Sequence, residues 1–482
     1  MARRAERDPY ADFLRSFSLL VVILWHWCFT ILVWNDDGPY ATNPLGFTSG
    51  LWIATWLLQV MPLFFYIGAY VHLKSWERAA ARGERLWHFA LRQAKSLAIP
   101  SAALLVTWVI LGIIVGIVFD LDWMGRAVLM VLSPLWFVVA YLVFVCLMPI
   151  SVWLHRRYDA LVLVFLGGLA VIVDVLRFRY QLPGIEWVNM VFVWGFAFQL
   201  GYFHGRISGV DSAPRYSDGR IDWEYQSPRS AQRARVMAAA GLFALIGLVF
   251  SGLYPGSMVG VPGEGSNMAP PTVCIIALTI FQVGVAELIR PSVLRGLARG
   301  GPFSRATAVF TRFALPLFLF HTTGMALSRG LEWTIFGTQT ETVAPTLTWW
   351  LLRPVAIIGP LLATLPVIYL FGRRWQTQTV TPPPRILPIV DEDVGDGGDG
   401  PLEPTRRNRP MIGPLPVVRP VQLRRRHAEP TAPPPPDPPQ RLGSDRAKPS
   451  DGTGAGGPPG SGAPGAPAHR SGSAAGVHRS VP

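Results

Sequence analysis

The sequence predicts an all-α, polytopic membrane protein with about ten transmembrane helices and a disordered C-terminal tail. Half of the 482 residues are hydrophobic, only 15% are charged, and the mean hydropathy is +0.33. A soluble domain of average composition carries about 25% charged residues, so most of this chain is expected to lie in lipid. The composition excludes collagen, a disulfide scaffold and a wholly disordered chain.

Ten apolar runs follow one another through the first 375 residues, and a helix needs roughly 20 residues to cross a bilayer. The runs are residues 16–34, 51–73, 96–119, 133–154, 159–176, 187–204, 236–253, 272–289, 313–328 and 346–372. Residues 1–375 are therefore interpreted as a transmembrane domain and residues 376–482 as a tail. The tail is rich in Pro, Gly, Ser and Arg, and it has too little apolar surface to offset its ordering entropy, which predicts disorder.

The basic residues between the runs predict the orientation of the chain. With a cytoplasmic N-terminus, the cytoplasmic segments hold 25 Lys and Arg residues and the opposite side holds 4. This distribution follows the positive-inside rule and predicts a multi-pass protein of the cell (plasma) membrane with both termini in the cytoplasm. The first run is interpreted as a retained helix, because no small-residue cleavage site follows it.

Charge and cysteine content exclude other classes of function. The net charge of +13 does not indicate nucleic-acid binding, because no basic face is interleaved with stacking aromatic residues. Cys28, Cys146 and Cys274 all lie in apolar runs, in a pattern that fits neither a disulfide framework nor a metal site. We therefore expect no metal and no permanently bound cofactor.

The first run holds the most informative pair of residues. Arg15 lies at its cytoplasmic mouth and His26 follows eleven positions later, about 16 Å along a helix and about 20° around it. An ionisable residue at that depth is costly and usually faces a bundle interior or a water-filled pathway. A cation at the interface can hold a phosphate, and an imidazole deeper on the same face can act as general base or nucleophile. Acyl-CoA fits this arrangement, because it has an anionic head, a long thin arm and a reactive end. Alternatively, His26 makes a structural hydrogen bond and Arg15 only sets the topology.

Five stretches carry a resemblance to a known family. They are Asp12-Phe-Leu-Arg15 with His26, Met61-Pro-Leu-Phe-Phe-Tyr-Ile-Gly68, Arg92-Gln-Ala-Lys95 before Pro100, Pro134-Leu-Trp-Phe-Val-Val-Ala-Tyr141, and Pro316-Leu-Phe-Leu-Phe-His321. In order, side and spacing they resemble the acyltransferase type 3 family of integral membrane proteins over about residues 8–372. The chain departs from the family pattern at Ile67, where a small polar residue is commoner, and at Lys95, where a second arginine is usual.

The resemblance implies roles for particular residues. It implies that His26 is the catalytic residue. It also implies that Arg15 and Arg92, together with Lys95, bind the phosphates of the acyl donor at the cytoplasmic face. Asp12 either orients Arg15 or forms an ordinary i,i+3 pair with it.

Other polar residues of the predicted helices are weaker candidates. His321, near the middle of the ninth run, either faces the same cavity as His26 or makes a structural hydrogen bond. Asp174 and Glu186 flank the outer loop after the fifth run. They could contact a hydroxyl acceptor, but acidic residues at the outer rim are more often simply solvated. Four further histidines lie near the cytoplasmic ends of helices, where a favourable helix dipole or contact with solvent explains their positions: His72, His88, His155 and His204.

The leading hypothesis is a membrane acyltransferase that moves a short acyl group, with acetyl expected, from cytoplasmic acyl-CoA to a hydroxyl. The acceptor would belong to a sugar, glycolipid, cell-surface polymer or small natural product. The expected partners are the acyl-CoA co-substrate, this acceptor and the lipid bilayer, with no nucleic acid. One alternative is a transporter or exporter of an anionic or sugar-linked substrate, although no repeat symmetry is detected. Another is a membrane scaffold that works through its tail.

Overall fold

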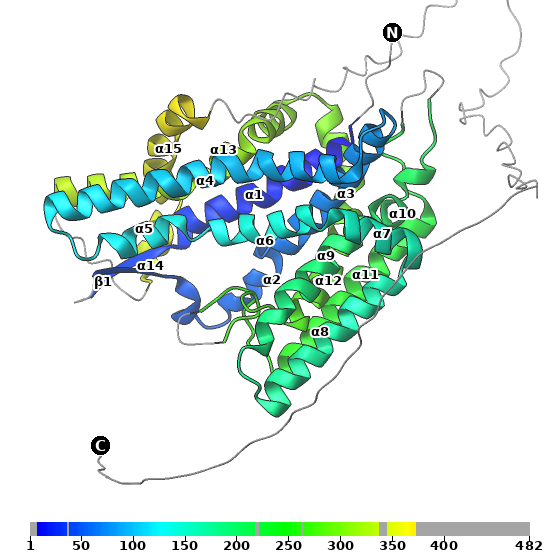
Figure 1. The fold of residues 1–482 in the computed structure, drawn as a ribbon, viewed down its shortest axis with the longest axis horizontal. Coiled ribbons are helices and arrows are strands. Elements are labelled where there is room, and N and C mark those ends of the chain that lie inside the picture. Colours follow the sequence, from blue (N-terminus) through cyan, green and yellow to red (C-terminus); the bar gives the residue numbers. More distant parts are fainter. Residues whose placement is uncertain (1–6, 36–37, 217–220, 262–264, 337–344, 373–482) are drawn as a thin grey trace, which may run out of the picture. The chain divides into compact units, whose positions relative to one another are not determined.

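The computed structural model describes residues 7–35, 38–216, 221–261, 265–336 and 345–372. These residues form a nearly all-helical fold with one two-stranded hairpin, as predicted from the composition (Figure 1). The predicted disordered tail, residues 376–482, lies outside the described residues.

Helix α1, Pro9–Phe29, carries the candidate site and begins at a strong capping signal. The carboxylate of Asp8 accepts hydrogen bonds from the backbone amides of Tyr10, at 2.9 Å, and Ala11, at 3.2 Å. These bonds satisfy two of the amides that a helix start leaves without partners. The 21 residues of the helix are enough to cross the hydrocarbon of a bilayer.

The remaining helices and strands follow α1 along the chain. The α-helices are α2 (Thr55–Leu58), α3 (Met61–Ala80), α4 (Leu86–Phe119), α5 (Met124–Leu132), α6 (Leu135–Cys146), α7 (Met148–Tyr158), α8 (Leu161–Tyr180), α9 (Asn189–Gly201), α10 (His204–Ser208), α11 (Pro228–Phe250), α12 (Val273–Ala298), α13 (Pro302–Phe336), α14 (Leu347–Leu352) and α15 (Ile358–Leu370). Strand β1 (Ile31–Asn35) pairs antiparallel with β2 (Gly38–Thr42). Short 3-10 helices are found at Pro44–Gly46, Leu51–Ala54, Ile185–Val188, Val210–Ser212 and Val355–Ile357.

Fewer of the described helices can span a membrane than the ten predicted. Seven are long and apolar enough, and α5 with α6 makes an eighth if this pair is one span. That pair bends by 43° next to Pro134, which has no amide hydrogen to continue the helix. Helix α9 has 13 residues, or about 20 Å, which is shorter than the hydrocarbon layer. The predicted span 346–372 is divided between α14 and α15 by a break at Pro354.

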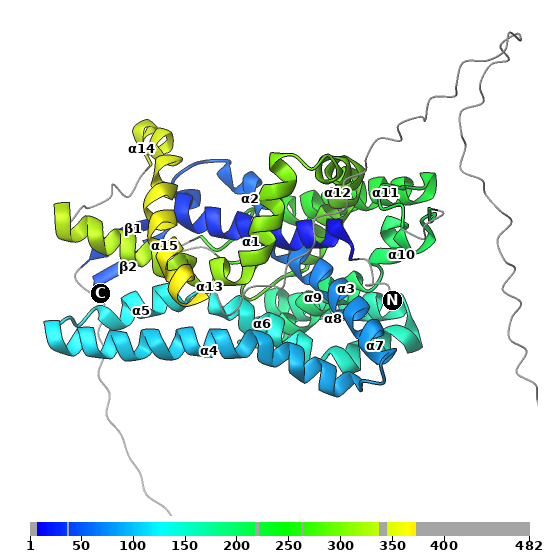
Figure 2. The same cartoon turned by 90° about the horizontal axis from the view of Figure 1, so that it is seen from above.

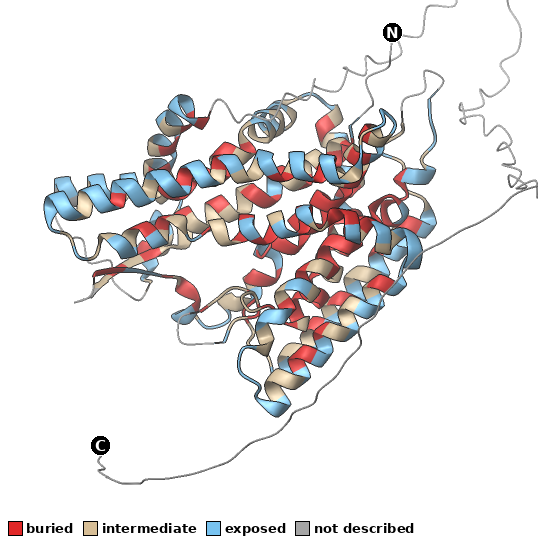
Figure 3. Cartoon of the chain, in the orientation of Figure 1, coloured by how far each residue is buried: buried red, intermediate tan, exposed pale blue. Residues whose placement is uncertain are grey.

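Helix α1 lies inside the helical assembly, whereas α4 lies on its outside (Figures 1 and 2). Helix α1 packs against α3, α12 and α13. Only 11% of the most apolar stretch of α4 is buried, against 67% for α12. The exposed side chains of α4 include Ile110, Ile113 and Ile117, so its blue surface in Figure 3 is an apolar surface suited to lipid contact.

The pairing of α11 and α12 depends on two glycines. A side chain at Gly241 would collide with the backbone of Phe281, and one at Gly284 would collide with the backbone of Ala238. Small residues at such contacts let two membrane helices approach until their backbones touch. This tight pair holds α12 firmly behind α1.

Candidate active site

A cavity of about 1020 Å³ lies at the end of the helices where α1 begins. Its walls come from the first half of α1, most of α3, the early turns of α4 and α13, and the segment that follows α10. Among the described residues, six basic ones line it, namely Arg7, Arg15, Lys74, Arg78, Lys95 and Arg215. Four acidic residues of the described chain also line it, namely Asp8, Asp12, Glu77 and Asp211. We call this space the basic cavity, because its cations outnumber its acids and suit an anionic ligand.

Arg15, on α1, lies in the wall of the basic cavity and has hydrogen-bond donors available for a ligand. Its side chain is partly buried, and its buried Nε atom has no hydrogen-bond partner in the described structure. The buried Oδ2 atom of Asp12, one turn earlier, has none either. No ion pair joins Asp12 to Arg15 in the described part of the chain. An arginine fork without a protein partner is available to a phosphate.

Lys95 and Arg92, three residues apart on α4, occupy different environments. Lys95 is exposed in the wall of the basic cavity. Arg92 does not line the cavity, and its guanidinium forms an ion pair of 2.8 Å with Glu84 while lying over the ring of Phe89. The structure therefore places Lys95, but not Arg92, in the wall of the cavity that Arg15 lines.

The opposite wall brings together two further stretches singled out in the sequence. Gly68 on α3 lines the cavity, and a side chain at this position would collide with the hydroxyl of Tyr141 on α6. Phe64 and His72, one turn before and after Gly68, line the same wall. The ring of His72 lies 5.9 Å from that of Tyr141, measured between ring centroids. His72 is thus a cavity residue rather than a solvated one at a helix end.

His26 and His321 meet between α1 and α13, with 5.1 Å between their ring centroids. His26 is partly buried, whereas His321 is completely buried. Nδ1 of His321 is hydrogen-bonded to the carbonyl oxygen of Phe318, and its Nε2 has no partner in the described structure. Nε1 of Trp27 donates a hydrogen bond of 2.9 Å to the carbonyl oxygen of His321, which fixes the two helices against each other.

The tautomer of His321 follows from this hydrogen bond. A carbonyl oxygen only accepts, so Nδ1 carries the hydrogen, and Nε2 of the neutral ring is left as an unpaired acceptor. An unpaired acceptor that is buried beside a second imidazole is uncommon, because burial of a polar atom without a hydrogen bond is costly. The pair His26 and His321 can therefore accept a proton from a bound hydroxyl.

Aromatic rings separate the basic cavity from the two histidines. Leu19 is the last residue of α1 in the cavity wall, and His26 lies seven residues, about 10 Å, further along the helix. Between them, rings follow one another from Phe64 to Phe137 (5.2 Å), to Phe318 (5.7 Å) and to His321 (5.6 Å). We call this row of rings, between the cavity wall and the histidine pair, the aromatic barrier.

The two acids that flank the predicted outer loop differ in environment. Asp174 is buried and accepts hydrogen bonds from Asn189 (2.8 Å), Tyr254 (3.0 Å) and the amide of Val273 (2.9 Å). It therefore joins α8, α9, α12 and the loop before α12, as a structural residue. Glu186 is partly exposed in the 3-10 helix before α9.

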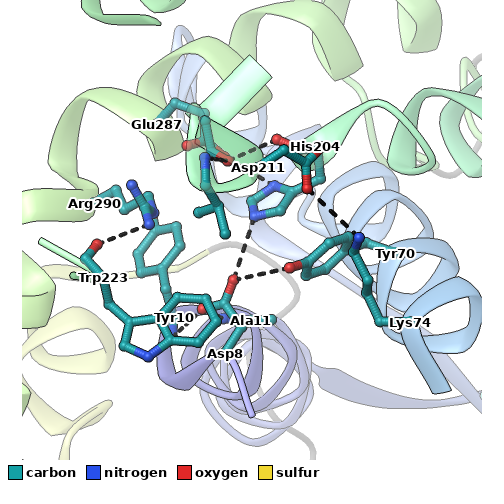
Figure 4. Close-up of polar contacts among 12 residues, drawn as sticks. Asp8, Tyr10, Ala11, Tyr70, Lys74, His204, Asp211, Trp223, Glu287 and Arg290 are labelled. Atoms are coloured by element: carbon teal, nitrogen blue, oxygen red, sulfur yellow. Dashed lines mark hydrogen bonds and ion pairs between the residues drawn. The ribbon is translucent and has the colours of Figure 1, made fainter. Parts of the chain in front are cut away.

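Sequence reasoning missed a buried charged cluster beside the basic cavity, shown in Figure 4. It contains Asp8, His204, Glu287 and Arg290. Glu287 and Arg290 stand one turn apart at the end of an apolar run, and that spacing was the available signal. The described residues contain no group of His, Cys, Asp or Glu side chains that could hold a metal ion.

Comparison with known proteins identifies the family. A family model described as an acyltransferase domain matches residues 8–373, which covers nearly the whole membrane part of the chain. Comparisons with curated proteins and with solved structures gave no match. The match agrees with the motif resemblance and with the apolar helices of the described structure. The chain is therefore a multi-pass membrane acyltransferase and belongs to the acyltransferase type 3 family.

Proposed function

We propose that this acyltransferase moves a short acyl group, with acetyl expected, from acyl-CoA to a hydroxyl group. The acceptor hydroxyl belongs to a sugar, glycolipid, cell-surface polymer or small natural product. The observation that carries the proposal is the position of Arg15, which lies in the wall of the basic cavity on the same helix face as His26. Its Nε has no hydrogen-bond partner among the described residues.

The basic cavity supports an anionic donor. Arg15 and Lys95 have no ion-pair partner in the described structure, whereas Lys74 already contacts Glu77 and Asp211. The guanidinium of Arg15 can grip a phosphate through two parallel hydrogen bonds, and Lys95 adds a point charge. Arg92, paired with Glu84 outside the cavity wall, is left out of this phosphate-binding set.

The histidine pair supports transfer deeper in the helices. As a general base, His26 takes the acceptor's proton while the hydroxyl oxygen attacks the thioester carbonyl; the coenzyme thiolate then leaves and takes that proton. As a nucleophile, neutral His26 instead attacks the thioester carbonyl, expels the coenzyme thiolate, gives it the ring proton and becomes an acyl-imidazole. The acceptor hydroxyl then attacks that acyl group, the acyl–nitrogen bond breaks, and the hydroxyl proton returns to the ring. In both cases Nε2 of His321, the unpaired acceptor, orients the acceptor hydroxyl or the ring of His26.

The orientation of the chain determines which side supplies the donor. The 25 to 4 distribution of basic residues supports a plasma-membrane protein with cytoplasmic termini, and the basic cavity then opens to the cytoplasm. The donor enters from the cytoplasm, and the acceptor must reach the histidine pair within the helices. Residues 376–482 then form a cytoplasmic tail.

Inverted membrane vesicles test the proposal, because their outer face is the cytoplasmic face. Acyl-CoA labelled on the acyl group is added outside, and lipid, polymer and small-molecule fractions are analysed for ester-bound label. The proposal predicts ester-bound label in vesicles with the chain and none in vesicles without it. Movement of an anion without covalent change, and no labelled ester in any fraction, would favour a transporter instead.

A further inference from the structure

The start of α1 is held by a buried ion bridge centred on His204 (Figure 4). Nδ1 of His204 lies 3.2 Å from Oε1 of Glu287 on α12, and its Nε2 lies 3.7 Å from Oδ2 of Asp8. All three side chains are buried. The imidazole therefore connects the residue that caps α1 to the helix packed behind it.

The bridge is balanced in charge. Asp8 and Glu287 bring two negative charges, and His204 with Arg290 brings two positive ones. Burial disfavours the charged ring, but Glu287 and Asp8 raise the pKa of His204 to about 9. Burial also opposes ionisation of Asp8, but its contact with His204 lowers the pKa of that carboxyl. Both groups are thus charged at neutral pH, and removal of one would leave its partner buried and unpaired.

Side chains from α3 and α12 make further hydrogen bonds around the bridge. From α3, the hydroxyl of Tyr66 lies 2.8 Å from Nδ1 of His204, and the hydroxyl of Tyr70 donates to Oδ2 of Asp8 at 3.4 Å. From α12, Arg290, one turn after Glu287, donates to the carbonyl oxygen of Trp223 at 2.8 Å, in the segment after α10. These contacts leave little freedom for the first turn of α1.

Asp8 connects this bridge to the basic cavity. One carboxylate oxygen caps the amides of Tyr10 and Ala11, while the other faces His204. Asp8 itself lines the cavity. Arg15 follows seven residues later, about 10 Å along α1 and on the same helix face. A shift of the first turn of α1 would therefore move Arg15 directly.

We propose that His204 is a positioning residue, whose ion bridge to Asp8 and Glu287 fixes the start of α1 and so holds Arg15 where the donor phosphates bind. The inference rests on the proposed function for the donor, but the hold on α1 is a separate physical claim. His204 touches neither donor nor acceptor. Replacement of His204 therefore affects donor binding, through Arg15, more than it affects the transfer step at His26, which lies five turns along α1.

The test compares His204→Gln with a matched control, His155→Gln. His155 lies on α7 against Phe203, outside the bridge and outside the cavity wall. We expect His204→Gln to raise KM for acyl-CoA about tenfold while kcat stays within about threefold. Hydrogen–deuterium exchange of the full-length protein should become faster in peptides covering residues 8–16. The control should leave KM and exchange unchanged.

A double variant guards against failure to fold. His204→Gln alone leaves the cluster with an excess negative charge, whereas Asp8→Asn with His204→Gln leaves Glu287 and Arg290 in balance. Asparagine caps a helix as well as aspartate does. We expect the double variant to fold and to raise KM for the donor above the parental value, by about as much as Asp8→Asn alone, because each of the two substitutions breaks the same contact between Asp8 and His204.

The outcomes separate the two claims. Folded His204→Gln protein with parental KM and parental exchange in residues 8–16 overturns the positioning role. So does a double variant whose KM for the donor equals that of the parent. If exchange becomes faster but the parent protein never binds or uses acyl-CoA, the hold of His204 on α1 is supported and the proposed donor is wrong.

Discussion

Tyr141 on α6 occupies the space that the missing side chain of Gly68 leaves on α3. A Cβ atom at Gly68 would overlap the hydroxyl oxygen of Tyr141. Gly68 lines the basic cavity, and Tyr141 is buried behind it. This contact lets the side chain of Tyr141 reach the backbone of α3, and it shapes the cavity wall at Gly68.

Replacement of Gly68 tests the importance of that contact. Gly68→Ala should destabilise the protein by about 1–3 kcal/mol, because the added methyl group overpacks against Tyr141. Thermal unfolding in detergent measures the loss, and Gly68→Ala with Tyr141→Phe should recover part of it. Gly168→Ala on α8 is the control, because no atom lies within 4 Å of its added methyl group. Equal melting temperatures for Gly68→Ala and the parent would contradict the close contact.

Substitution of Arg15 tests donor binding. Arg15→Ala should raise KM for acyl-CoA about 10- to 100-fold, the loss expected for a hydrogen-bonded charge pair. Arg15→Lys should fall between this variant and the parent, because lysine keeps the charge and loses the fork. Steady-state kinetics with purified protein measure both.

Arg92→Ala is the matched control for Arg15→Ala. Arg92 is paired with Glu84 outside the cavity wall, so its loss should change KM for acyl-CoA by less than about threefold. The assignment of the phosphate site to Arg15 fails if Arg92→Ala proves the more harmful of the two substitutions.

The sequence was enough to predict the helical class, the position of α1 and the candidates Arg15 and His26, because each depends on local apolar pattern and helix geometry. The environment of Arg92 could not be predicted in this way. Residues 92 and 95 are only about 60° apart around α4. That residue 95 lines the cavity and residue 92 does not depends on how α4 packs. The partners of His204 lie far away in the chain, at Asp8 and Glu287, and no local pattern joins them.

The aromatic barrier should limit acyl chain length. Phe318→Leu replaces a ring beside His321 by a smaller group and should increase transfer of a six-carbon acyl chain relative to acetyl. The control is Phe144→Leu, a ring of the same kind that contacts Phe198 away from the histidine pair. Competition between acetyl and hexanoyl donors measures the preference. An unchanged preference in folded Phe318→Leu protein would mean that acyl chains do not pass the barrier.

The ion bridge of His204 predicts how stability depends on pH. Glu287 and Asp8 raise the pKa of His204 against the effect of burial, to about 9 in the folded protein. The ordinary value is about 6.5. The stabilisation is therefore complete below about pH 6.5 and is lost as the pH rises through about 9. Melting temperatures should fall across this range for the parent and more weakly for His204→Gln, and parallel curves would disprove the ion bridge.

The central claim is that His26 carries out transfer from a donor held at Arg15. The most direct test measures acyl transfer and acyl-CoA binding with purified His26→Ala protein in lipid nanodiscs. We expect transfer to fall by about 10²–10⁴-fold, as when a general base is lost, while donor binding stays within about threefold of the parent. Transfer at the parental rate by folded His26→Ala protein would contradict it.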